Sequence, residues 1–297
     1  MPCLFKETKK AIKSAGYKPQ KKLGQNFSVS FSALKKTVQA AELKASDLIL
    51  EIGSGTGSLT KELAKTAKKV LAVEKDKFLF SLLKQNLAEQ KIKNIELVNA
   101  DARFVDFEKI LKKSKYKAVA NLPFYLTAMI IRKFLESKNK PEVMVFLVQK
   151  EMAQRISAKP PKMNKLAASV QFYAAAEIAG YVSKKSFWPK PKVDGAIIKI
   201  TPFGKMPATE AKLFFQVVNC GFSQPRKQLI NNFANLKKVF PRITKKKIIF
   251  WLEKNQIEPT RRPETLTVGE WRKLALSVNA VISDRRLPTL KPAKISG

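Results

Sequence analysis

Five short apolar runs, separated by segments long enough for helices, constrain the fold of this chain more than any other feature of its sequence. They predict strands at 48–53, 70–74, 95–98, 118–121 and 143–149. Uninterrupted apolar runs of this length are typical of strands buried on both faces. Because parallel strands need a long crossover between them, the series predicts an α/β fold with a mostly parallel sheet.

Two further runs, at 176–182 and 193–200, predict an antiparallel edge on that sheet. Beyond 204 the apolar residues follow helical spacing, and Thr267 with Glu270 matches a capping box for the last helix. The expected helices lie at about 207–222, 225–236, 244–256 and 267–282.

These patterns divide the chain into four parts. We predict a flexible basic arm over 1–22, an α/β domain over 23–204, a small helical domain over 205–283 and a flexible tail over 284–297. The arm carries seven lysines and one acid and shows little periodicity.

The charge balance predicts a polyanionic partner. Lysine and arginine total 58 against 23 acids, a formal net charge of +35. Such an excess attracts nucleic acid, because each neutralised phosphate releases a counterion; a generally basic composition is the alternative. We find no apolar run near the roughly 20 residues that span a bilayer and no signal-peptide pattern, so we predict a cytoplasmic protein with no membrane partner.

The chain contains no histidine and only two cysteines, Cys3 and Cys220. Two cysteines do not make a disulfide framework or a zinc site. Without imidazole, Ser-His-Asp and Cys-His catalysis are excluded, and the commonest transition-metal ligand is missing. We therefore expect no metal centre and a reaction that proceeds without an imidazole base.

A glycine-rich turn follows the first predicted strand and precedes a helix, with glycines at 53, 55 and 57. Glu74, Asp101 and Asn121 end the next three strands, and Glu74 stands 21 residues after Gly53. The carboxyl ends of parallel strands meet at one edge, where such sheets bind ligands and where a carboxylate can accept ribose hydroxyls. For Glu74 or Asp101 alone, helix capping is the alternative. Together the residues predict a nucleoside-bearing cofactor.

The glycine pattern separates two cofactor classes. A dinucleotide fingerprint would place its third glycine at Ser58, and no Walker Gly-Lys-Ser/Thr is present. The pattern instead resembles that of the class I methyltransferases.

Asn121-Leu122-Pro123-Phe124 follows the fourth strand and resembles the motif of methyltransferases that act on exocyclic amines of nucleobases. Such an amine is a poor nucleophile, because its lone pair is delocalised into the ring. The Asn121 amide oxygen and a carbonyl near Leu122 can accept its two hydrogens, and Pro123 stiffens the turn. Phe124 can stack on the flipped base and stabilise the developing positive charge.

Four more segments resemble one family, the ribosomal RNA adenine N6,N6-dimethyltransferases, which modify adjacent adenines near the 3′ end of small-subunit rRNA. They are Lys21–Phe27, Phe187–Asp194, Phe222–Leu229 and Arg262–Leu266. The resemblance implies a Rossmann-like class I methyltransferase domain over 23–204 that uses S-adenosyl-L-methionine. It also implies a helical domain that docks on rRNA within a pre-ribosomal small subunit.

The resemblance assigns roles to individual residues. It places Asn121, Leu122, Pro123, Phe124 and Phe187 around the target amine and its base. The predicted cofactor contacts are Gln25, Asn26, Ser28, Gly53, Gly55, Glu74, Lys75, Asp101, Ala102 and Asn121.

Cations interleaved with aromatics predict an RNA surface beside this site. Lys184, Lys185, Lys190 and Lys192 surround Phe187 and Trp188, although packing against the sheet is the alternative for Trp188. The other predicted RNA contacts are Lys21, Lys22, Arg226, Lys227, Arg261 and Arg262.

Four residues depart from the family pattern: Ser28 stands for leucine, Phe124 for tyrosine, and Gln224-Pro225 for more typical residues. Two alternatives stay open, a 23S rRNA adenine methyltransferase of the macrolide-resistance type and a non-catalytic ribosome-assembly factor. A DNA methyltransferase is disfavoured, because no target-recognition domain is evident. We expect a monomer.

Overall fold

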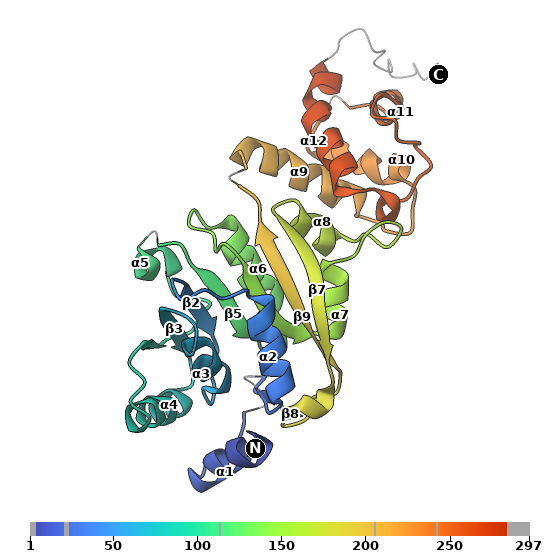
Figure 1. Cartoon of the computed structure of the whole chain (residues 1–297). Coiled ribbons are helices and arrows are strands. Elements are labelled where there is room, and N and C mark those ends of the chain that lie inside the picture. Colours follow the sequence, from blue (N-terminus) through green and yellow to red (C-terminus); the bar gives the residue numbers. More distant parts are fainter. Residues whose placement is uncertain (1–3, 21–23, 113, 205, 242, 284–297) are drawn as a thin grey trace, which may run out of the picture. The chain divides into compact units, whose positions relative to one another are not determined.

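The computed structural model of the chain (Figure 1) describes residues 4–20, 24–112, 114–204, 206–241 and 243–283. These residues form two compact units. Unit 1 comprises Met1–Gln154 and Ala174–Phe203, and unit 2 comprises Arg155–Tyr173 and Gly204–Gly297. The tail predicted over 284–297 lies outside the described residues.

The division after Phe203 lies beside the boundary predicted at 204, but residues 155–173 belong to the helical unit and not to the α/β unit. The reason is packing. Met163 and Phe172 join the apolar core of unit 2, where the ring of Phe172 stacks on Phe214 with 4.1 Å between centroids. A segment of about 20 residues gives no sequence signal of which distant core it joins.

Unit 1 contains a seven-stranded sheet with the order β4-β3-β2-β5-β6-β9-β7. The five strands from β4 to β6 are parallel, and β9 and β7 are antiparallel to their neighbours. This confirms the predicted fold class and every predicted strand. The strands are β2 (Leu48–Ile52), β3 (Lys69–Glu74), β4 (Ile95–Asn99), β5 (Lys117–Asn121), β6 (Met144–Gln149), β7 (Ala174–Val182) and β9 (Gly195–Pro202).

Burial explains the two sequence patterns. The apolar side chains of β2, β3, β5 and β6 are buried, except the half-buried Leu48, as expected for strands covered on both faces. The edge strand β7 alternates between buried or half-buried and exposed positions. Residues of β2, β3, β5 and β6 pack with α2 and α3 in one apolar cluster.

The helices of unit 1 are α1 (Leu4–Ser14), α2 (Phe31–Ala40), α3 (Ser58–Ala64), α4 (Lys77–Glu89), α5 (Phe107–Leu111), η2 (Phe124–Leu126), α6 (Thr127–Glu136) and η3 (Lys184–Ser186), and α7 (Lys150–Ile156) begins in this unit.

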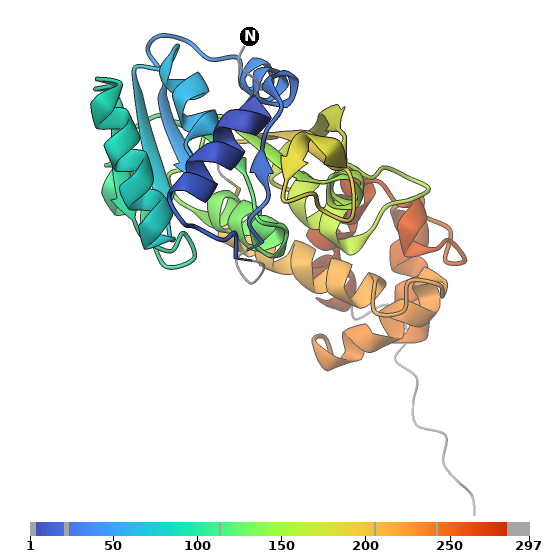
Figure 2. The ribbon, with the colours of Figure 1, turned by 90° about the horizontal axis from the view of Figure 1, so that it is seen from below.

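The prediction of a flexible arm over 1–22 is wrong for Leu4–Ser14, which form helix α1. Thr8 and Ile12, one helical turn apart, are buried, and Ile12 packs with Phe27 and Leu79. Figure 2 shows α1 in dark blue in front of the sheet. Residues 1–22 contain seven lysines, and their number outweighs the short buried stripe of α1 in the sequence pattern. The pattern therefore predicts a solvated arm.

A second, two-stranded sheet joins distant segments of unit 1. Strand β1 (Phe27–Ser28) pairs with β8 (Phe187–Trp188) in antiparallel orientation, with Phe27 opposite Trp188 and Ser28 opposite Phe187. The rings of Phe27 and Trp188 stack with 6.5 Å between centroids. This pairing holds the segment that precedes β2 against the loop that precedes β9.

Unit 2 is helical, and its core includes Trp251 and Trp271, both fully buried. Thr267 and Glu270 form the predicted capping box, since the Glu270 carboxylate accepts from Thr267 N at 2.7 Å and Thr267 Oγ1 accepts from Glu270 N at 3.1 Å. Its remaining elements are α8 (Lys165–Gln171), α9 (Ala208–Gly221), α10 (Leu229–Asn232), η4 (Phe233–Lys238), α11 (Lys245–Lys254), η5 (Pro263–Thr265) and α12 (Val268–Ser283).

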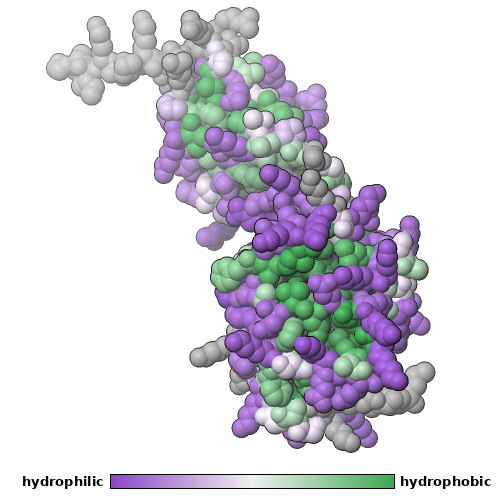
Figure 3. All heavy atoms as spheres, turned by 90° about the vertical axis from the view of Figure 1, so that its left-hand side faces the viewer, coloured by the Kyte–Doolittle hydropathy of each residue, from purple (hydrophilic) through white to green (hydrophobic). Residues whose placement is uncertain are grey.

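The helix predicted over 225–236 begins only at Leu229. The Asn232 side chain bonds three backbone groups of the preceding turn, Gln224 N, Gln224 O and Lys227 O, and these bonds hold that turn outside the helix. Hydrophilic side chains cover much of the face seen in Figure 3, with apolar patches between them. Among the described residues, no helix combines the length and hydropathy required for a membrane span.

Candidate active site

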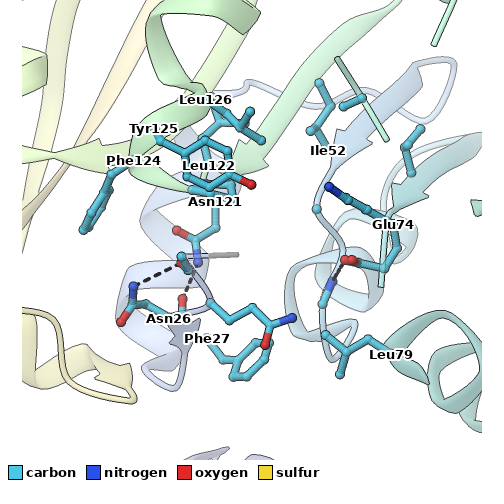
Figure 4. A pocket seen from close by; sticks show the side chains of 18 of the residues that line it. Asn26, Phe27, Ile52, Glu74, Leu79, Asn121, Leu122, Phe124, Tyr125 and Leu126 are labelled. Atoms are coloured by element: carbon cyan, nitrogen blue, oxygen red, sulfur yellow. Dashed lines mark hydrogen bonds between the residues drawn. The ribbon is translucent and has the colours of Figure 1, made fainter. Parts of the chain in front are cut away.

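A pocket with an empty volume of about 820 Å³ lies at the carboxyl ends of the parallel strands. Segments from β1, the glycine-rich turn, β3, β4, β5 and β8 all contribute to its wall (Figure 4). The structure brings together these predicted residues: Gln25, Asn26, Gly53, Gly55, Glu74, Lys75, Asp101, Ala102, Asn121, Leu122, Pro123, Phe124 and Phe187.

The glycine-rich turn requires its glycines. Gly53, Gly55 and Gly57 have φ of 74°, 55° and 79°, a left-handed region that disfavours other residues. A Cβ on Gly57 would also lie 2.2 Å from Leu83 Cδ1 of α4. The turn thus combines a tight backbone with close packing on the neighbouring helix.

Glu74 ties this turn to the end of β3. Its Oε2 accepts from Gly55 N and its Oε1 from Asp76 N, both at 2.8 Å. Burial raises the pKa of this carboxyl group, while the backbone donors oppose the shift. The cap of α4 is instead Asp76, which accepts from Phe78 N and Leu79 N. The capping alternative for Glu74 is therefore wrong, and each Glu74 oxygen keeps a lone pair for a ligand hydroxyl.

Asp101 is a paired carboxylate at the pocket wall. Arg103 donates to both of its oxygens, the shortest bond being 2.6 Å from NH2, and Lys75 Nζ lies at 2.9 Å. The hydrogen bonds from Arg103, followed by those from Lys75, hold its pKa far below the usual range, so it is ionised at neutral pH. Asp101 offers a charged acceptor, while Lys75 acts by pairing with it.

Asn121 has a fixed orientation. Its Nδ2 donates to the carbonyl oxygen of Asn26 at 3.0 Å (Figure 4). Because a carbonyl can only accept, the amide nitrogen must face Asn26, which leaves Oδ1 as an acceptor for an incoming amine. The following turn is held by the bonds from Leu122 N to Leu147 O and from Leu126 N to Pro123 O.

Two aromatic rings complete the pocket. Phe124 is half-buried in the turn after β5, and Phe187 is buried in β8. Trp188 stacks on Phe27, which supports packing as the role of its ring. Ser28 does not line this pocket; it lines a neighbouring cavity with an empty volume of about 320 Å³ behind the glycine-rich turn.

Sequence reasoning missed part of the pocket wall, including Phe27, Leu79 and Tyr125. Leu79 belongs to the apolar face of α4 and carries no sequence signal of a site, whereas Phe27 ends the Lys21–Phe27 segment that resembles the family and could have been included. Outside the pocket lining, Tyr17 supports the start of α4: its hydroxyl donates to Asp76 Oδ2 at 2.6 Å, and its ring stacks on Phe78.

The predicted RNA contacts fall into separate places. Lys185, Lys190 and Lys192 are exposed around β8, Lys184 is half-buried, and Lys21 and Lys22 lie outside the described residues. In unit 2, five cations line one groove: Arg226, Lys227, Lys237, Lys245 and Arg262.

Arg261 joins two elements of unit 2. Its Nη1 lies 2.5 Å from Glu270 Oε1, and its Nη2 donates to the Thr265 carbonyl at 2.6 Å. These bonds join η5 to the start of α12. They give Arg261 a structural role, and its RNA contact stays a prediction.

The cavity behind the glycine-rich turn contains a buried carboxyl group, Glu51. Its Oε2 and the hydroxyl groups of Ser28 and Ser54 are buried, and none of the described residues forms a hydrogen bond with them. Burial raises the pKa of Glu51 to about 8, and the nearby Glu74 charge adds to the shift. At neutral pH, Glu51 is largely protonated in the folded protein.

This shift predicts a pH-dependent stability. Because the folded pKa of about 8 exceeds the ordinary 4.5, protonation of Glu51 favours the folded state. Its contribution to the free energy of unfolding is complete below pH 4.5 and is lost as the pH rises toward 8. In wild type, the free energy of unfolding should therefore fall by several kcal/mol over this range, at about 1.4 kcal/mol per pH unit, and we expect Glu51→Gln to remove this fall. Urea unfolding between pH 5 and 9 measures it, with the exposed Glu89→Gln as control. Equal pH profiles for wild type and Glu51→Gln would contradict the assignment.

The family model for ribosomal RNA adenine dimethylases matches residues 16–274. The chain belongs to this family. It is an rRNA adenine dimethyltransferase with the class I methyltransferase fold, and the match covers most of both units. It is 39% identical over 278 residues to a protein of Dehalococcoides mccartyi named ribosomal RNA small subunit methyltransferase A, covering 93% of this chain and 94% of that protein.

A protein of the same name from Clostridium botulinum is 37% identical over 273 residues, 90% of this chain and 97% of that one. Among solved structures, a dimethyladenosine transferase from Plasmodium falciparum matches with a TM-score of 0.71 and 26% identity, covering 85% and 97% of the two chains. The 23S rRNA methyltransferase ErmE shares the fold, with a TM-score of 0.70 and 21% identity over 86% and 100%.

Proposed function

We propose that this protein transfers methyl groups from S-adenosyl-L-methionine to the N6 amines of two adjacent adenines near the 3′ end of small-subunit rRNA. One observation carries the proposal most directly. The oriented Asn121 amide and the Leu122–Leu126 turn share one pocket with Glu74 and Asp101. An acceptor for an aromatic amine therefore lies beside two acceptors suited to a nucleoside.

The hydrogen-bond acceptors of the pocket fit the cofactor. Glu74 is held by two backbone donors and keeps lone pairs for the two ribose hydroxyls, and ionised Asp101 can accept from the exocyclic amine of the cofactor's adenine. The left-handed glycines at 53 and 55 let the cofactor approach the main chain closely. S-adenosyl-L-methionine, when bound, supplies the electrophilic methyl group.

The residues after β5 prepare the amine. Asn121 Oδ1 accepts one amine hydrogen, and the Leu122 carbonyl is the proposed acceptor of the other. These two hydrogen bonds favour a pyramidal nitrogen, whose lone pair is then free to attack the methyl group. As the nitrogen–carbon bond forms, the carbon–sulfur bond of the bound cofactor would break, and S-adenosyl-L-homocysteine would leave. Phe124 stacks on the base and stabilises the developing positive charge, with Phe187 against the same base. The amine proton leaves to water, and no imidazole is needed.

The substrate assignment rests on charge and on the names of the relatives. Both relatives described above are named small-subunit methyltransferases. We propose that the lysines around β8 and the cationic groove of unit 2 bind phosphates of rRNA in a pre-ribosomal small subunit. We also propose that the protein acts as a monomer in the cytoplasm.

Nucleoside mass spectrometry tests the substrate. Unmethylated small subunits and 23S-containing particles are incubated separately with the protein and labelled S-adenosyl-L-methionine. We expect labelled N6,N6-dimethyladenosine only in the small subunit. Label confined to 23S rRNA would identify a resistance-type enzyme, and no label in either particle would favour an assembly factor.

A further inference from the structure

Two aromatic side chains beside the pocket are exposed. Phe104 is 79% exposed, and Tyr125 is 53% exposed. Single apolar side chains on a surface are ordinary, but aromatic rings gathered at a binding site commonly contact a ligand. Neither residue belongs to the sequence motifs that point to catalysis.

Phe104 is presented by a rigid turn. The turn follows Asp101 and Ala102 in the pocket wall, and Phe104 N donates to Asp101 O at 2.9 Å. From α6, Lys133 Nζ donates to the carbonyl oxygens of Ala102, Arg103 and Val105, at 3.0, 2.9 and 2.6 Å. A turn held by four such bonds keeps the Phe104 ring in solvent with little freedom of the backbone.

Arg103 connects this ring to the pocket. Its guanidinium group binds Asp101 and lies over the Phe104 ring, 5.1 Å from the centroid. Tyr125 follows Phe124 and lines the same pocket as Asp101, the carboxylate that Arg103 binds. Arg103, Phe104 and Tyr125 therefore form an aromatic rim with one cation, at the mouth of the site.

We propose that this aromatic rim stacks on the nucleotide adjacent to the target adenine, with Phe104 as the principal platform. The inference rests on the proposed function. The pocket receives one flipped adenine at a time, so when the substrate carries two neighbouring adenines, the second must lie outside it. An exposed ring beside the mouth, in a chain with net charge +35, suits a base of single-stranded RNA. The rim thus keeps the second adenine close while the first reacts.

Binding of an RNA hairpin with two adjacent adenines in its loop tests the rim. Phe104→Ala should bind the hairpin between about 5-fold and 150-fold more weakly, the range for losing one base–aromatic stack. Phe104→Leu, which keeps apolar bulk without a π face, should lose a similar factor, and Phe104→Trp should restore binding. In methylation assays the KM for RNA should rise, while kcat at saturating RNA changes much less.

Phe203→Ala is the matched control. Phe203 is also an exposed phenylalanine, but it follows β9, which runs antiparallel to β6. It therefore lies at the amino ends of the parallel strands, whereas the pocket lies at their carboxyl ends. This variant should bind RNA as wild type does, and all variants should keep wild-type affinity for S-adenosyl-L-methionine. The rim proposal is wrong if Phe104→Ala or Phe104→Leu retains wild-type affinity and KM. Failure of wild type to methylate any RNA would count against the proposed function, while the binding comparison would still test the rim.

Discussion

Asn121→Ala should lower kcat for methyl transfer by at least about 10²- to 10³-fold, the usual loss when one acceptor or donor preorganised for the transition state is removed. The Asn121 amide oxygen acts on the reacting amine, and the other predicted cofactor contacts, Glu74 and Asp101 among them, are unchanged in this variant. Affinity for S-adenosyl-L-methionine should therefore stay within about tenfold, or about 1.4 kcal/mol. Single-turnover methylation and calorimetric binding of the cofactor measure the two quantities separately.

Asn94→Ala provides a matched control for this variant. The Asn94 amide also donates to backbone carbonyl oxygens, those of Ala64 and Ala67, but it precedes β4 at the edge of the sheet opposite the site. Its loss should lower stability and leave kcat unchanged. If Asn121→Ala weakened cofactor binding as much as transfer, or if Asn94→Ala reduced transfer equally, the amine-binding role of Asn121 would be wrong.

Local sequence patterns predict much of unit 1. Apolar runs predict all seven large strands, and the signal is strongest for β2, β3, β5 and β6, because strands covered on both faces must be apolar nearly throughout. The chain direction then places Glu74, Asp101 and Asn121 at one edge of the sheet, since parallel strands share their carboxyl ends. For these residues the topology alone determines that the side chains meet.

Other parts of the site depend on contacts between distant segments. Ser28 pairs with Phe187 across β1–β8, and neither two-residue strand has a recognisable pattern. Ile12 is a buried residue of the lysine-rich helix α1, and Phe172 packs in the core of unit 2 although its segment lies in the sequence between two parts of unit 1. Such pairings are decided by shape and burial over the whole unit, which local periodicity does not encode.

The geometry also separates residues of similar sequence appearance. Glu74 and Asp76 lie two residues apart, yet Asp76 caps α4 and Glu74 holds the glycine-rich turn. Arg261 and Arg262 are adjacent, yet Arg261 binds Glu270 and Arg262 lines the cationic groove. A carboxylate can cap a helix or hold a turn, and an arginine can form an internal ion pair or line a groove. In each pair, the direction of the side chain decides which role the residue takes.

Glu74→Ala should weaken binding of S-adenosyl-L-methionine by about 100-fold. Two hydroxyl hydrogen bonds to a charged acceptor account for about 3 kcal/mol at the lower end of their usual range. The substitution also leaves Gly55 N and Asp76 N without their acceptor, so the glycine-rich turn loses its tie to β3. Because the amine acceptor Asn121 is unchanged, kcat at saturating cofactor should fall far less than the affinity.

Calorimetric titration of the cofactor into Glu74→Ala and into Glu62→Ala measures this effect. Glu62 is a carboxylate of α3 paired with Lys65 outside the pocket, so its removal controls for the loss of negative charge near the turn. We expect Glu62→Ala to bind the cofactor as wild type does. Unchanged affinity in Glu74→Ala would exclude a ribose contact by this carboxylate. Equal losses in affinity and in kcat would instead mean that the glycine-rich turn positions the amine as well as the cofactor.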